Sequence, residues 1–168
     1  MLITGKSGNI KTSRVSNKNI DVLRIEWYEA TKRILHKQTD SGIAITLKFL
    51  NENPNLKDGD ILHQDENSII AVHIIPCECI VVSPGTIITA SSLCYEIGNR
   101  HLPLFYEGDD LLVPYDVPLF NLLEASGYKP VIELRKLDIA FKTSVLPHLQ
   151  VAGTGSLFTK VSKLSTSS

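Results

Sequence analysis

Strand and helix signals follow one another in the stretch Cys77-Glu-Cys-Ile-Val-Val-Ser-Pro-Gly85 and in the segment Thr86 to Ile97. The apolar residues up to Val82 predict a strand, which the Ser-Pro-Gly turn residues end. Apolar residues then recur at i, i+3, i+7 and i+10, which predicts a helix with one apolar stripe. The stripe comprises Ile87, Ala90, Cys94 and Ile97. We expect Gly98-Asn99 to end this helix, because glycine adopts the left-handed conformation without steric cost.

The residues that follow predict two more strands, a second helix and a last strand. Asp116 is a good N-cap, Pro118 is tolerated in the first turn, and Gly127 can end the helix. We expect Leu119, Leu122 and Leu123 to form the buried face of that helix. The strands are expected at 102–106, 111–115 and 131–137. The order β-α-β-β-α-β is that of the ferredoxin-like fold.

Upstream of this module, the first 75 residues carry mainly strand signals. Strands are expected at 20–27, 33–39, 43–49, 61–62 and 69–75. Asp40-Ser-Gly42 lies between two of them and predicts a hairpin. Many short strands separated by turn residues indicate a small β-sandwich or barrel. We therefore predict an α+β protein with an all-β domain at 1–75, a ferredoxin-like domain at 76–141 and a flexible tail at 142–168.

Composition and charge exclude several classes of protein. The 168 residues include 17 Lys plus Arg and 18 Asp plus Glu, whereas a general nucleic-acid binder has a basic footprint. The longest apolar stretch, 69–82, is interrupted by His73, Pro76 and Glu78, so it does not predict a membrane span. The N-terminus shows no signal peptide, and three cysteines do not form a disulfide framework. We therefore expect a cytoplasmic protein.

The net charge of −1 conceals an uneven distribution. Residues 1–75 carry a net charge of +1, residues 76–141 carry −5 and residues 142–168 carry +3. We expect the basic tail to be drawn electrostatically toward the acidic domain, with salt weakening the attraction. The acidic run 107–116 either raises the local cation concentration by its field or forms an ordinary solvated hairpin.

The chain has no Walker, Rossmann, Gly-x-Ser-x-Gly or His-Glu-x-x-His motif. Candidate chemistry therefore rests on five histidines and three cysteines. His101 follows the first predicted helix and allows two interpretations. It is either a surface histidine favoured by the helix dipole or a metal ligand, since neutral imidazole binds Ni, Cu and Zn.

The string Cys94-Tyr-Glu-Ile-Gly-Asn-Arg-His101 resembles the signature of the UreE family, the urease accessory proteins that act as nickel metallochaperones. Ile25-Glu-Trp27, Lys32-Arg-Ile-Leu35, Asp58-Gly-Asp-Ile-Leu62 and Leu112-Val-Pro-Tyr-Asp116 extend the similarity over about residues 1–140. The resemblance implies a β-rich domain called peptide-binding, a ferredoxin-like metal domain and no enzymatic activity. It also implies a homodimer that acts with a urease accessory GTPase and the apo-urease assembly.

The same resemblance implies that His101 from each chain holds one Ni²⁺ at the dimer interface. His148 lies in the predicted tail, where family members commonly carry histidines that complete or extend the site. Here it is the one tail histidine, and it is either a ligand or an incidental tail residue. Imidazole does not select nickel over Zn²⁺ or Cu²⁺, so both are alternative ions in vitro.

Cys77 and Cys79 offer a rival hypothesis, in which the protein is a thiol redox protein or binds Zn or Cu. Alternate residues of a strand share a face, so the two thiols can clasp a soft metal. Their apolar neighbours instead favour packing, as does the position of Cys94 on the helix stripe. A third hypothesis is a peptide-binding or folding chaperone that acts through the β domain alone. We expect His36, His63 and His73 to be ordinary histidines and Asp116 to be a helix cap.

Overall fold

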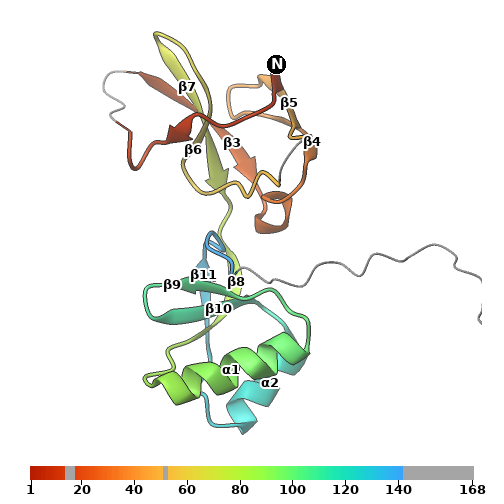
Figure 1. Cartoon of the computed structure of the whole chain (residues 1–168), viewed down its shortest axis with the longest axis vertical. Helices are drawn as coiled ribbons and strands as arrows, with labels where there is room; N and C mark the ends of the chain where they lie inside the picture. Colours follow the sequence, from red (N-terminus) through yellow and green to blue (C-terminus); the bar gives the residue numbers. More distant parts are fainter. Residues whose placement is uncertain (14–17, 51–52, 142–168) are drawn as a thin grey trace, which may run out of the picture.

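The computed structural model describes residues 1–13, 18–50 and 53–141. Two β sheets occupy the N-terminal half, and a mixed α/β domain follows them (Figure 1). The N-terminal elements are β1 (Leu2–Ile3), β2 (Gly8–Asn9), β3 (Asn19–Ile25), the 3₁₀ turn η1 (Trp27–Glu29), β4 (Ile34–Gln38), β5 (Ala44–Lys48), β6 (Asp60–Gln64) and β7 (Ser68–Ile74).

The N-terminal strands form one sheet in the order β1-β5-β4 and another in the order β2-β6-β7-β3. The predicted hairpin is confirmed, since β4 and β5 pair antiparallel with Leu35 opposite Leu47. β3 instead pairs in parallel with β7. Apolar side chains of both sheets meet in one core, comprising Leu23, Ile25, Ile45, Leu47, Phe49, Leu56, Ile70, Val72 and Ile74 among others. The predicted strand 20–27 stops at Ile25, because Trp27 starts a 3₁₀ turn.

The C-terminal domain contains β8 (Cys77–Val82), α1 (Ile87–Asn99), β9 (Phe105–Glu107), β10 (Asp110–Pro114), α2 (Val117–Ala125) and β11 (Val131–Arg135). Its sheet has the order β11-β8-β10-β9 with antiparallel neighbours throughout. This arrangement confirms the predicted ferredoxin-like fold and the α+β class. Both helices lie on one side of the sheet, and the N-terminal sheets lie on the other (Figure 1).

The alternation along β8 places the two faces of this sheet in different cores. Ile80 and Val82 pack with residues of both helices. Cys79 and Val81 belong to the opposite cluster, which Trp27 of η1 contacts. The central strands β8 and β10 are therefore buried on both faces over most of their length, which explains the apolar run at 79–82.

The predicted apolar stripe of α1 is partly wrong. Leu93 and Ile97 are fully buried, Cys94 packs against them, and Ile87 is 82% exposed. On a helix of 3.6 residues per turn, Ile87 lies about 100° around from the row that Leu93 and Ile97 form. The core therefore follows the i, i+4 row of Leu93 and Ile97, and Leu93 lies outside the predicted stripe.

Local capping residues explain where the helices begin and end, except at the C-terminal end of α1. The Thr86 hydroxyl accepts a hydrogen bond from the Thr89 N–H (3.1 Å), and the Asp116 carboxylate accepts one from the Leu119 N–H (2.8 Å). The predicted cap at Asp116 and the end of α2 before Gly127 are confirmed, with φ of 81° at the glycine. Leu119 and Leu123 are buried as predicted, and Leu122 is half-buried.

The predicted end of α1 at Gly98-Asn99 is wrong, because both residues belong to the helix. The left-handed residue that ends α1 is His101, with φ of 56°. Histidine is among the non-glycine residues enriched in this conformation. The predicted tail 142–168, with His148, lies outside the described residues. None of the helices in the described part of the chain is long and apolar enough to cross a membrane.

Candidate functional site

His101 lies at the exposed end of α1, two residues beyond the last helical residue, Asn99. The Arg100 N–H donates to the Ile97 carbonyl (3.1 Å), and the His101 N–H donates to the Gly98 carbonyl (3.0 Å). These two bonds tighten the last turn and fix the backbone of His101. The helix end thus holds an exposed imidazole on a rigid element, as a ligand at a surface contact requires.

The outer face of α1 leads directly to His101. Ile88, Ser92, Tyr95 and Asn99 recur at i, i+4, i+7 and i+11, and we call these four residues the α1 outer stripe. Ile88 is 76% exposed and Tyr95 is 69% exposed. The stripe contains no charged residue, and Ile87 lies beside it. An uncharged face with large exposed apolar side chains is typical of a surface that contacts another protein.

The α1 outer stripe is not part of the predicted helix pattern, which contains a single, core-facing row. The signal was nevertheless present. Ile88 and Tyr95 are large apolar residues seven positions apart, opposite the buried row of Leu93 and Ile97. A second apolar row on the side of a helix that faces away from the core is a candidate contact surface.

The exposed imidazole of His101 is one candidate metal ligand. Within residues 1–13, 18–50 and 53–141, no group of three or more His, Cys, Asp and Glu side chains is arranged to hold a metal ion. His36, His63 and His73 lie on β4, β6 and β7 of the N-terminal sheets, and not on α1. His36 contacts the Thr46 hydroxyl at 3.1 Å, across the β4–β5 pair.

The pair Cys77 and Cys79 does share a face of β8, with 3.7 Å between the two Sγ atoms. Cys79 is completely buried, and burial raises the pKa of its thiol to about 12. Burial also raises the pKa of Cys77 and of Cys94. Because the thiolate is the metal ligand and the nucleophile, a raised pKa keeps these residues as inert thiols. The geometry favours packing over redox or metal chemistry.

The acidic run 107–116 is engaged in local structure. Glu107 forms an ion pair with Arg135 at 2.6 Å, and Asp110 lies 3.7 Å from the same guanidinium. Asp116 caps α2 as described above. These contacts are those of a structured hairpin and a helix cap, and they weaken the interpretation of the run as a device that attracts cations.

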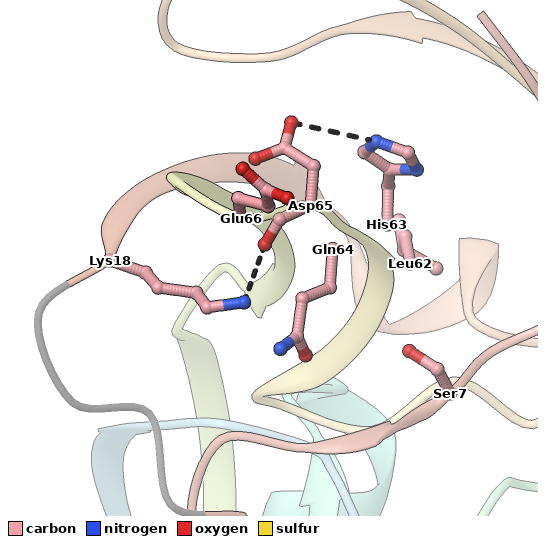
Figure 2. Close-up of a pocket in the computed structure, with 7 residues that line it drawn as sticks. All are labelled: Ser7, Lys18, Leu62, His63, Gln64, Asp65 and Glu66. Carbon is pink, nitrogen blue, oxygen red and sulfur yellow. Dashed lines mark hydrogen bonds and ion pairs between the residues drawn. The ribbon is translucent and has the colours of Figure 1, made fainter.

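An open hollow of about 710 Å³ lies on the N-terminal sheets, near the turn between β6 and β7 (Figure 2). Its lining residues are Ser7, Lys18, Leu62, His63, Gln64, Asp65 and Glu66. The Asp65 carboxylate faces His63 at 3.9 Å, but it also accepts hydrogen bonds from Ser68 and Asn67 (Figure 2 shows the first contact). The Ser68 hydroxyl and these backbone N–H groups lower the pKa of Asp65. The carboxylate therefore stabilises the turn, and the hollow is separate from His101.

Comparison with known proteins gives a consistent result over both halves of the chain. Residues 3–74 match the family described as the UreE urease accessory protein, N-terminal domain, and residues 78–146 match its C-terminal domain. The urease accessory protein UreE of Flavobacterium johnsoniae is 39% identical over 161 residues, covering 96% of this chain and 97% of that protein.

Two further relatives carry the same name. The protein of Acetivibrio thermocellus is 41% identical over 129 residues, covering 77% of this chain and 84% of its own length. The protein of Helicobacter bizzozeronii is 35% identical over 161 residues, covering 93% of this chain and 90% of its own length. The similarity therefore extends over nearly the full length of several relatives.

Proposed function

Because the chain belongs to the UreE family of urease accessory proteins, we propose that it is a homodimer that holds one Ni²⁺ between His101 of each subunit and delivers it for urease assembly. The family is one of accessory proteins that serve nickel delivery in urease maturation, and not of enzymes. The observation that carries the finer proposal is the exposed His101 at the end of the uncharged α1 outer stripe.

Coordination chemistry supports the dimer. One imidazole is one donor, whereas Ni²⁺ takes four to six donors, commonly in square-planar or octahedral geometry. A two-fold axis doubles every ligand without new sequence, because the same surface meets itself. If the α1 outer stripe lies at that axis, two copies of Ile88 and Tyr95 bury each other and the two His101 side chains converge beside them.

The small number of fixed ligands suits a carrier. A site with two protein imidazoles leaves coordination positions of the Ni²⁺ open. A receiving protein can therefore bind the ion before the two imidazoles dissociate from it. We include His148 in this proposal as a further ligand, although it lies outside the described residues. Zn²⁺ and Cu²⁺ are expected to compete for the same imidazoles in vitro.

The proposed partners are a urease accessory GTPase and the apo-urease assembly, with which the dimer acts in the cytoplasm. We also propose that residues 1–75 and 76–141 are separate domains. The strand pairings support this division into two domains, because all strands of any one sheet lie either within residues 1–75 or within residues 76–141. Deleting residues 1–75 separates this proposal from a chaperone that acts through the β domain alone, because nickel held by His101 is expected to survive the truncation.

Calorimetry with matched histidine variants tests the proposal. Wild type is expected to bind one Ni²⁺ per dimer tightly, and His101→Ala is expected to lose the tight site. His36→Ala is the control, because His36 is also exposed but lies on β4. His148→Ala tests the second ligand. Unchanged nickel binding in His101→Ala would show that the site is elsewhere.

A further inference from the structure

The N-terminal sheets and the C-terminal domain meet through two sets of contacts. In the apolar set, the rings of Trp27 and Phe105 pack edge to face with centroids 5.7 Å apart. The polar set comprises Asp58, His73, Lys136 and Asp138, which we call the junction cluster. The Lys136 ammonium donates to the Asp58 carboxylate at 2.8 Å, and the Asp138 carboxylate accepts from the Asp58 N–H at 2.9 Å.

Asp58 is the centre of this cluster. Its side chain is 13% exposed, and it also accepts a hydrogen bond from the Ile74 N–H at 3.1 Å. Ile74 is the last residue of β7, three positions before β8 starts. The junction cluster therefore lies where the chain passes from the N-terminal sheets to the C-terminal domain, and Lys136 and Asp138 return to it after β11.

The contact between Lys136 and His73 constrains the protonation of the imidazole. The Lys136 Nζ lies 3.3 Å from the His73 Nδ1. An ammonium group has three donors and no acceptor, so this contact is a hydrogen bond only if Nδ1 carries a lone pair. His73 must then be neutral. Protonation would place an N–H of the imidazolium against the ammonium and would convert attraction into repulsion.

We propose that Lys136, Asp58 and His73 form an acid-released latch that holds the C-terminal domain in one orientation on the N-terminal sheets. The latch is closed while His73 is neutral and accepts from Lys136. It loosens when His73 is protonated, because Lys136 then faces a second cation. The function of the latch does not depend on nickel, so it can be tested without the metal.

The other charges around His73 fit this assignment. From β3, Arg24 lies directly opposite His73 and is paired with Asp40 of the following hairpin. From the turn before β6, Asp58 lies 3.7 Å from Nδ1, and Lys11 lies 3.3 Å from the other carboxylate oxygen of Asp58. The groups that face His73 directly or through Asp58 are Arg24, Asp40, Asp58, Lys136, Lys11 and Asp138.

Burial and Lys136 lower the pKa of His73 below its ordinary value of 6.5 and outweigh the opposing effect of Asp58. A histidine whose pKa is lower in the closed state stabilises that state fully above 6.5. The stabilisation is lost as the pH falls from 6.5 through the lowered pKa. Burial acts to raise the pKa of Asp58, but hydrogen bonds from Lys136 and Ile74 outweigh it and lower the pKa, so Asp58 stays ionised in this range.

Nuclear magnetic resonance on the full chain without metal tests the latch in two steps. The first step follows the His73 imidazole in a pH titration of wild type and of Lys136→Met. We expect the pKa of His73 to shift upward in the variant, because the neighbouring cation is gone. Lys6→Met is the matched control, since Lys6 also lies 2.8 Å from a buried carboxylate, that of Asp60, with a similarly exposed side chain.

The second step measures hydrogen exchange at the Asp58 and Ile74 amides, corrected for the intrinsic effect of pH. In wild type, both amides are expected to keep their protection above pH 6.5 and to lose it as the pH falls from 6.5 through the lowered pKa of His73. His73→Gln keeps an acceptor that never ionises, so its protection is expected to stay constant. Loss of protection in His73→Gln equal to that of wild type, or a His73 pKa unaffected by Lys136→Met, would overturn the proposal.

Discussion

Replacing Ile88 by serine should weaken the proposed dimer without unfolding the subunit. Ile88 is 76% exposed in the single chain and makes no contribution to the buried core of α1. Substitutions at such positions change stability by about 0.5 kcal/mol or less. The effect of Ile88→Ser on dimer dissociation can therefore be measured while the subunit stays folded.

The magnitude follows from the exposed area. Full burial of an isoleucine side chain contributes about 1.5–3 kcal/mol, so burying the exposed three quarters of Ile88 contributes about 1–2 kcal/mol per subunit. A two-fold interface contains the residue twice, which gives about 2–4 kcal/mol per dimer. At about 1.4 kcal/mol per factor of ten, the dissociation constant should rise about 30- to 700-fold.

Sedimentation velocity over a range of concentrations measures this change. Ile34→Ser is the matched control, because Ile34 is 55% exposed but lies on β4 of the N-terminal sheets. We expect Ile34→Ser to dimerise like wild type and Ile88→Ser to dissociate at far higher concentration. If Ile88→Ser dimerises as tightly as wild type, the α1 outer stripe is not the interface.

Three further predictions concern the stability of the C-terminal domain and its thiols. Leu93→Ala removes a fully buried side chain and should cost about 2–5 kcal/mol of unfolding free energy in a urea titration, whereas Ile87→Ala on the same helix should cost about 0.5 kcal/mol or less. Asp116→Ala removes the α2 cap and should lower the free energy of unfolding by about 0.5–2 kcal/mol. Asp116→Ser should restore most of this loss, because serine is also a good N-cap. Equal losses in both variants would argue against capping. Because the pKa of Cys79 is raised to about 12, a thiol reagent at pH 7.5 should label this residue only as the protein unfolds, and rapid labelling of native protein would revive the thiol hypothesis.

Local signals explain why much of the C-terminal domain could be predicted. The run 79–82 is apolar because both faces of this part of β8 are buried. Asp116 and Gly127 mark the two ends of α2 through backbone chemistry that needs no distant partner. These local signals predict the order of strands and helices, and that order predicts the ferredoxin-like topology.

The end of α1 could not be predicted in the same way. Gly98 is the best local candidate for a left-handed residue, yet it lies inside the helix, and His101 adopts that conformation. Leu102 and Leu104 then pack against the core beneath the helices. We infer that the helix continues until the chain can turn these two leucines inward, which is a tertiary requirement that no local pattern encodes.

The junction cluster was missed for a different reason. Lys136 lies 78 residues from Asp58 and 63 residues from His73 along the chain. In the sequence, His73 is an isolated histidine within an apolar strand and Lys136 is one of many lysines. Only the return of the chain after β11 brings them together, so their roles depend on topology and not on motif.

In the proposed dimer, His101 of each subunit binds the same nickel ion. Native mass spectrometry of an equimolar mixture of wild-type and His101→Ala chains, with one chain carrying a mass tag, resolves both homodimers and the heterodimer in a single nickel titration. We expect one Ni²⁺ on the wild-type dimer, none held tightly by the variant dimer and greatly weakened binding to the heterodimer. Two nickel ions on the wild-type dimer, or a heterodimer that binds as tightly as wild type, would contradict the shared site.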